Sequence, residues 1–195
     1  MTNSVKITKA ELANLPMEEF AGRIIVVDQP EDVDAAISTL RQQSHVGFDT
    51  ETRPSFHKGN RYGVALMQIA TQDICYLFRL NKIGMPEALI DFLADPEVIK
   101  VGLSLRDDFG AIRRRVETEL AGFLDLQNYV GQFGIGDASL QKIYAILFGK
   151  KISKRQRLTN WEALSLTEAQ RKYAALDAWA CLVIYTHLNN GNHHI

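Results

Sequence analysis

Short apolar runs alternate along the chain with stretches in which apolar residues recur at helical spacing. Short runs rich in β-branched side chains are typical of buried strands. They predict strands over Ile24–Val27, His45–Glu51, Val64–Ala70, Ile74–Phe78 and Val98–Leu103, with a further short strand at Leu124–Leu126. Polar residues 71–73 separate the third run from the fourth, which predicts a hairpin.

Helices are predicted where apolar residues recur at a spacing of three and four. Thr8 and Glu11 form a capping-box pattern, and Thr167 caps the last and longest helix. The predicted helices cover 8–14, Asp32–Gln43, Pro86–Leu93, Arg106–Val116, Ser139–Leu147 and Thr167 to about His187, and another begins within Asn128–Gln132. Strands interrupted by helices predict an α/β fold, a mixed five-to-six-stranded sheet with helices on both faces.

Composition adds little to this picture. The chain has 195 residues, of which 46% are hydrophobic and 23% charged, as in an ordinary globular domain. Its formal net charge of −1 gives no global positive field that would indicate a nucleic-acid partner. A bound metal ion would supply positive charge that this count omits, so such a partner stays open.

Cysteines and hydropathy indicate a cytoplasmic location. Cys75 and Cys181 both lie in apolar segments, which is typical of buried reduced thiols rather than of a disulfide framework. The first residues, MTNSVKITKAEL, lack the apolar core of a secretion signal. No apolar run approaches the roughly 20 residues that span a membrane. We therefore expect a soluble, cytoplasmic protein with no membrane partner; its oligomeric state is not predicted.

Three segments are expected from the same pattern. Residues 1–22 form an N-terminal arm with a short helix, residues 23–190 form the main domain, and residues 191–195 form a frayed tail. The tail contains His193 and His194, which are a weak indication of metal binding on their own. We find no internal repeat, low-complexity segment or linker in the sequence.

The strongest candidate chemistry lies in the His45–Glu51 run, which reads HVGFDTE. Alternate side chains of a strand point the same way, so Asp49 and Glu51 share one face. Two such carboxylates raise each other's pKa unless a positive group lies between them. A divalent cation serves this role, since Mg²⁺ prefers oxygen ligands. Solvation or pairing with Lys or Arg is the alternative, and D-x-E alone favours that alternative.

Two further stretches carry acids in structured surroundings. Asp107 and Asp108 follow the strand that ends near Leu103, where either one could serve as a first-turn helix acid or as a third carboxylate of a site. Tyr173 and Asp177 are spaced i,i+4 and share a face of the last helix. An Asp inside an apolar helix is costly unless it is paired or binds a metal. We favour a functional role for Asp177.

With these acids in this order, the sequence resembles the DEDDy subgroup of the DnaQ-like 3′–5′ exonuclease superfamily. Ribonuclease D and the Werner-type exonuclease domains are members of that subgroup. Its D-x-E motif corresponds to Asp49-Thr50-Glu51, its second motif to KVGLSLRDD with Asp108 as the acid, and its third to Tyr173 and Asp177. The similarity covers roughly Gly22–Leu188. It also extends to the segments Val64–Phe78, Leu140–Lys150 and Asn160–Ala178. Ser104 stands where many relatives have Asn, and Thr52 where some have Trp.

The resemblance implies a ribonuclease H-like fold and two-metal hydrolysis of phosphodiester bonds. It implies that Asp49, Glu51 and Asp177 hold one divalent ion, with Asp49 bridging to a second ion that Asp108 supports. Mg²⁺ is the expected metal, and Mn²⁺ is expected to substitute. Tyr173 would hydrogen-bond the attacking water. Because an unperturbed tyrosine has a pKa of about 10, we favour an orienting role over that of a base.

Basic and aromatic side chains are candidates for holding a single-stranded or 3′-ended nucleic acid. The densest basic cluster comprises Lys150, Lys151, Lys154, Arg155 and Arg157, with Arg113–Arg115 and the Arg53–Arg61 loop as secondary candidates. A solvated charged face is the alternative for each. Stacking on bases is sequence-tolerant, and its candidates are Phe56, Tyr62, Phe109 and Trp161. We expect most of these rings to lie in the core and favour Phe109, next to Asp108, for stacking.

Three functions fit these observations. The first is a metal-dependent 3′–5′ exonuclease that releases 5′-mononucleotides from DNA or RNA. The second is a non-catalytic nucleic-acid-binding module that retained the fold, which the loss of any of the four acids would favour. The third is a metal-dependent phosphatase of small nucleotides, which would need a closed pocket.

Overall fold

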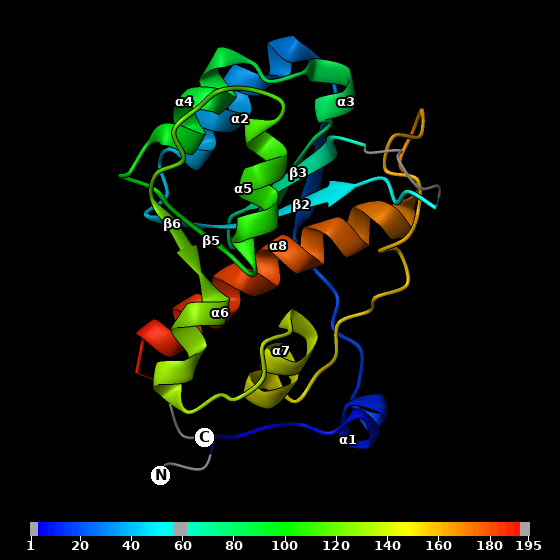
Figure 1. Cartoon of the computed structure of the whole chain (residues 1–195), viewed down its shortest axis with the longest axis vertical. Helices are drawn as coiled ribbons and strands as arrows, with labels where there is room; N and C mark the ends of the chain where they lie inside the picture. The colour runs from blue at the N-terminus through cyan, green and yellow to red at the C-terminus, as the bar shows by residue number, and fades with distance from the viewer. Residues whose placement is uncertain (1–3, 57–61, 192–195) are drawn as a thin grey trace.

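A six-stranded mixed sheet lies at the centre of the molecule, in the order β1-β4-β3-β2-β5-β6 (Figure 1). The computed structural model describes residues 4–56 and 62–191; part of the Arg53–Arg61 loop and of the 191–195 tail lie outside the described residues. β3 runs antiparallel to both of its neighbours, and the remaining pairs are parallel. The strands are β1 Arg23–Val27, β2 His45–Thr52, β3 Val64–Ala70, β4 Ile74–Phe78, β5 Ile99–Gly102 and β6 Phe123–Asp125.

Helices cover both faces of this sheet, as the sequence predicts. α7 (Leu140–Phe148) and the long α8 (Glu168–Asn189) pack on one face. The other face carries α2 (Val33–Leu40), α3 (Leu80–Ile83), α4 (Glu87–Ala94) and α5 (Leu105–Arg113). The remaining helices are α1 (Lys9–Asn14), α6 (Leu126–Tyr129) and two 3-10 turns at Pro30–Asp32 and Val130–Phe133. The predicted α/β fold class is confirmed.

The alternation of side chains along β2 decides which face carries the candidate acids. Val46 and Phe48 are fully buried in the core beneath α2 and α4. Gly47 therefore faces the opposite side, where a Cβ would lie 1.9 Å from the carbonyl oxygen of Ala178 in α8. This close approach explains the glycine. It also directs Asp49 and Glu51 toward α8, because they lie two and four residues further along the strand.

Local capping signals fix several helix ends. The Thr8–Glu11 and Thr167–Gln170 capping boxes both form in full, so α1 and α8 begin where the sequence predicts. Pro86 is the N-cap of α4 rather than a residue of its first turn. α3 was not predicted, because a single helical turn is too short to show a periodic pattern.

The described part of the N-terminal arm runs beside the α7 side of the molecule (Figure 1). Val5 forms a bridge with Ile135, and Met17 forms one with Lys151. Lys150 pairs with Glu18 at 3.1 Å, which ties the arm to the segment after α7. Cys75 and Cys181 are buried and unpaired. None of the described helices has the length and apolar character needed to cross a membrane.

Candidate active site

Three acids converge where β2 passes beneath α8. Asp49 and Glu51 come from β2, and Asp177 comes from the middle of α8. One carboxylate oxygen of each lies within 4.8 Å of the other two. Glu51 and Asp177 are each 8% exposed, and Asp49 is half-buried. The fold thus brings Asp177 of α8 to two acids of β2 that lie 126 and 128 residues earlier in the sequence.

This cluster carries more negative charge than its surroundings compensate. Burial, followed by repulsion from Asp177 and Asp108, raises the pKa of Glu51 to about 9. Burial also raises the pKa of Asp177 to about 7, although a hydrogen bond from Tyr173 and the charge of Lys154 oppose that shift. The pKa of Asp49 lies well above its ordinary value for the same two reasons, burial and neighbouring acids.

The donor set fits a hard divalent cation. All three groups offer carboxylate oxygens, which Mg²⁺ and Mn²⁺ prefer. Oδ1 of Asp177 is buried, and no group in the described ranges supplies it with a hydrogen bond. A buried acceptor without a donor is costly, and a cation would satisfy it while relieving the repulsion.

Asp108 approaches this cluster from the other face of β2. It accepts a hydrogen bond from Oγ1 of Thr50, the residue between the two strand acids. It is not one of the three grouped carboxylates, yet its charge raises the pKa of both Asp49 and Glu51. Burial raises its own pKa to about 6. Asp107 is exposed, so the structure places Asp108 and not its neighbour beside the site.

Two residues that the sequence reasoning missed hold Asp108 in position. Asp125, at the end of β6, accepts hydrogen bonds from the backbone N–H groups of Ser104 and Leu105 at 2.9 and 3.0 Å. These bonds fix the start of α5, three residues before Asp108. Thr50 supplies the side-chain hydrogen bond. A lone Asp after an apolar run is a recognisable capping signal for Asp125, whereas nothing in the sequence indicates the partner of Thr50.

Tyr173 lies one helical turn before Asp177 and is hydrogen-bonded to it. It is 9% exposed and packs against Trp161, with ring centroids 6.0 Å apart. Burial, followed by the charges of Asp177 and Glu51, raises the pKa of Tyr173 far above its ordinary value. The phenol therefore keeps its proton at neutral pH.

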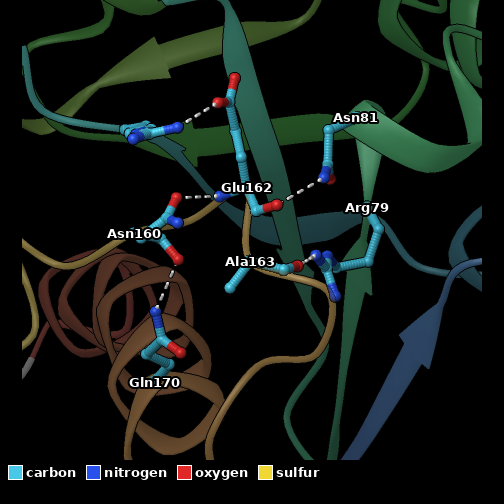
Figure 2. A network of polar contacts seen from close by, with 7 residues as sticks. Arg79, Asn81, Asn160, Glu162, Ala163 and Gln170 are labelled. Carbon is cyan, nitrogen blue, oxygen red and sulfur yellow. Dashed lines mark hydrogen bonds and ion pairs between the residues drawn. The ribbon is translucent and has the colours of Figure 1, made fainter.

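Trp161 lies in the core, and this corrects its predicted role in base stacking. Its side chain is 0% exposed, so it has no face available to a nucleobase. The loop that carries it is fixed by three hydrogen bonds to backbone carbonyls, drawn in Figure 2. Their pairs are Arg79 with Ala163, Asn81 with Glu162 and Gln170 with Asn160. The indole of Trp161 packs against the ring of Tyr173 on the core side.

The predicted basic cluster is divided by the fold. Lys154 and Arg157 line a cleft of about 350 Å³ together with Tyr173 and Asp177. Arg155 lines a different pocket, of about 280 Å³, on the side of Met17 and Phe20. Lys150 and Lys151 bind groups of the N-terminal arm, Glu18 and the Ala13 carbonyl. Lys154 and Arg157 are thus the cluster members placed beside the acids.

Phe109 is half-buried beside Phe123 of β6. Its ring packs edge-on against Phe123 of β6 with centroids 4.9 Å apart, and the guanidinium of Arg113 lies 5.9 Å above it. Both phenylalanines belong to the apolar cluster on the α5 side of the sheet. Phe56 is 77% exposed, and Tyr62 stacks with Arg53 at 4.6 Å, in a pocket of about 320 Å³ beyond the end of β2.

An α/β domain whose central strand and covering helix form a buried carboxylate cluster beside a basic cleft has the kind of site that metal-dependent enzymes acting on phosphate esters use. Comparison with known proteins specifies the family. The protein-family model described as 3′–5′ exonuclease matches residues 24–191 of the chain. The chain belongs to this family, within the DnaQ-like superfamily that the motifs indicate.

Two curated relatives are consistent with this membership, and one solved structure shares the fold. The bifunctional 3′–5′ exonuclease/ATP-dependent helicase WRN of Mus musculus is 30% identical over 187 residues, covering 91% of this chain and 13% of the relative. A 3′–5′ exonuclease of Arabidopsis thaliana is 30% identical over 195 residues, covering 92% and 68%. The crystal structure of the Aedes aegypti Nibbler EXO domain superposes with a TM-score of 0.78 at 23% identity, covering 98% and 93%. This superposition establishes the shared fold.

Proposed function

We propose that this chain is a DEDDy-type 3′–5′ exonuclease, which hydrolyses phosphodiester bonds from the 3′ end of DNA or RNA and releases 5′-mononucleotides. The observation that carries the proposal is the convergence of Asp49, Glu51 and Asp177 within 4.8 Å of one another. Membership of the 3′–5′ exonuclease family supports the same reaction. Asp108 and Tyr173 complete the group of residues to which we assign roles.

The acids divide into two sets of ligands. Asp49, Glu51 and Asp177 would hold one divalent ion, and Asp49 together with Asp108 would support a second. We assign Mg²⁺ to this site, with Mn²⁺ as a substitute, because the ligands are carboxylate oxygens. Such ions supply an activated water and neutralise charge on the phosphate and on the leaving oxygen.

Tyr173 orients the attacking water. Its hydroxyl lies beside Asp177 at the edge of the cleft, so it can donate to or accept from a water in that position. The raised pKa of the phenol leaves almost no phenolate at neutral pH, which favours orientation over proton abstraction. Trp161 fixes the tilt of this ring from the core side.

Lys154 and Arg157 would contact the phosphates of the bound strand. Both side chains are exposed and line the same cleft as Asp177. Their charges already act on the acids, since Lys154 lowers the pKa of Asp177 and Arg157 lowers that of Glu51. Contacts of this kind recognise the backbone, so they accommodate single-stranded DNA and RNA alike.

A non-catalytic binding module is the second candidate, and it is not favoured. A module that had lost catalysis would have no reason to retain four mutually repelling acids, of which Glu51 and Asp177 are 8% exposed. A phosphatase of small nucleotides is favoured still less, because Lys154 and Arg157 extend the cleft to exposed surface.

The test is end-labelled single strands of DNA and of RNA, each incubated with Mg²⁺ and with EDTA. We expect stepwise shortening from the 3′ end in Mg²⁺, none in EDTA, and none for Asp49→Ala. Asp107→Ala is the matched control, because it removes an exposed neighbouring acid and should retain activity. Internal cleavage, shortening from the 5′ end, or full activity of Asp49→Ala would contradict the proposal.

A further inference from the structure

A fully buried glutamine lies in β3 without a hydrogen-bond partner. Gln68 is 0% exposed, and every other residue of this strand is an apolar buried residue. Its Oε1 and Nε2 both lack partners among the residues that the structure describes. An unsatisfied buried polar group destabilises a fold, so an apolar side chain of equal size would suit this position better.

The second buried glutamine shows the contrast. Gln170 is 4% exposed, and its amide donates to Oγ1 of Thr159 at 3.0 Å and to the carbonyl of Asn160 at 3.2 Å. Its Oε1 accepts from the backbone N–H of Thr167 at 3.0 Å (the Asn160 bond is visible in Figure 2). The side chain of Gln170 therefore contributes hydrogen bonds to the fold, whereas that of Gln68 makes none with the described residues.

The strand register places Gln68 directly beside the acid site. It pairs with Asp49 of β2 on one side and with Leu77 of β4 on the other. Directly opposite residues of antiparallel strands point to the same face, with Cβ atoms about 4.5–5.5 Å apart. Along its own strand, the neighbours on that face are Leu66 and Ala70. Asp49 is thus the single polar group among these four neighbours.

The covering helix supplies one more unsatisfied group on this face. α8 lies against both β2 and β3, and Oδ1 of its Asp177 is buried without a donor from any described residue. The unpaired donor Nε2 of Gln68 and the unpaired acceptor Oδ1 of Asp177 therefore lie between the sheet and α8. Gln68 is the register partner of Asp49, and Asp177 is itself a member of the acid cluster.

We propose that Gln68 is a positioning residue for the divalent-cation site, and that its Nε2 donates to the Asp49 carboxylate when a cation occupies the acid cluster. The inference rests on the proposed function. An unrestrained aspartate can rotate its carboxylate away from a ligand position. A hydrogen bond to a carboxylate lone pair that faces no ion fixes the orientation, as outer-shell partners of metal ligands do.

The same pairing gives the buried amide of Gln68 a role. In the cation-bound protein its Nε2 acquires an ionised acceptor, and a bond of that kind is roughly twice as strong as a neutral one. In the cation-free protein the unpaired amide destabilises the fold. Replacing Gln68 should therefore weaken cation binding without weakening the cation-free fold, a combination that a purely structural residue would not show.

Titration calorimetry with Mn²⁺ on the full chain tests this, using Gln68→Met as a variant of similar volume without polar atoms. Outer-shell replacements weaken metal binding about 10- to 100-fold, and we expect a loss in that range. The melting temperature in EDTA should stay equal or rise. Met67→Leu is the matched control, because Met67 is equally buried but belongs to the apolar cluster on the opposite face. It should bind Mn²⁺ as the wild type does.

The outcomes are separable. Mn²⁺ affinity of Gln68→Met within twofold of the wild type would overturn the inference while leaving the proposed function intact. A fall in melting temperature in EDTA with unchanged affinity would assign Gln68 a structural role instead. If Gln68→Met does not fold, Gln68→Asn replaces it, since its amide is one methylene too short and should also weaken Mn²⁺ binding. A wild type that binds no Mn²⁺ would refute the cation site itself.

Discussion

Replacing Asp177 by asparagine should change the stability of the protein in opposite directions with and without divalent cation. The pKa of Asp177 is about 7 in the folded chain against an ordinary 3.8, chiefly because the carboxylate is buried. Between these values the folded state binds a proton that the unfolded state does not. The free energy of unfolding therefore falls as pH rises through that window.

The magnitude follows from the size of the shift. A difference of about 3 pKa units corresponds to about 4 kcal/mol at pH 8, where the group is ionised in both states. Asparagine keeps the shape and removes this penalty, but it weakens the charge-assisted bond from Tyr173, worth about 1.5–3 kcal/mol. The net gain in the absence of metal is about 1–2.5 kcal/mol. For a chain of this length it raises the melting temperature by about 2–10 °C.

Divalent cation should reverse the order. Bound ions stabilise the wild type by about 4.1 kcal/mol at a thousandfold excess over Kd, which exceeds the variant's metal-free advantage, whereas the variant lacks one ligand and gains little. The assay is thermal unfolding at pH 8 in EDTA and in saturating Mn²⁺. Asp107→Asn removes the same charge from an exposed position and should shift stability by less than about 0.5 kcal/mol. An Asp177→Asn variant that is less stable than the wild type in EDTA would refute the reasoning.

Three other predictions concern the surroundings of the acids. Tyr173→Phe should lower kcat while Mn²⁺ affinity by calorimetry stays nearly unchanged; loss of Mn²⁺ binding would contradict the orienting role. Thr50→Val should remove the hydrogen bond to Asp108, cost about 1–2 kcal/mol in denaturant unfolding and weaken the second ion more than the first; equal stability would show the bond to be unimportant. Arg79→Met should remove the hydrogen bond to the Ala163 carbonyl and increase proteolysis of the loop at 160–163. Unchanged cleavage rates would show that this hydrogen bond does not hold the loop.

Strong periodicity explains why so much of the fold follows from sequence. The run before Asp49 and the capping box at Thr167 are local signals, and both elements form as predicted. α3 is a single turn and carries no such signal. The positive φ of Ser104, 59°, reflects the backbone bonds that Asp125 makes across 20 and 21 residues. A tertiary contact of this kind leaves no local pattern.

The sequence predicted which acids lie together in the structure, and it predicted less about their surroundings. The acids follow from strand alternation and helix spacing, and Tyr173 from its position one turn before Asp177. Which basic residues face the acids depends on tertiary packing. Glu18 of the N-terminal arm binds Lys150, whereas Lys154 lines the cleft beside Asp177. An aromatic residue such as Trp161 is equally compatible with core and surface until its neighbours are known.

The most direct test of the central claim is the anomalous diffraction of crystals soaked in Mn²⁺. The account predicts an anomalous peak bounded by the carboxylates of Asp49, Glu51 and Asp177, with ligand distances of about 2.1 Å. A second, weaker peak is expected between Asp49 and Asp108. A well-diffracting soaked crystal with no peak among these three side chains, or with peaks only elsewhere on the molecule, would contradict it.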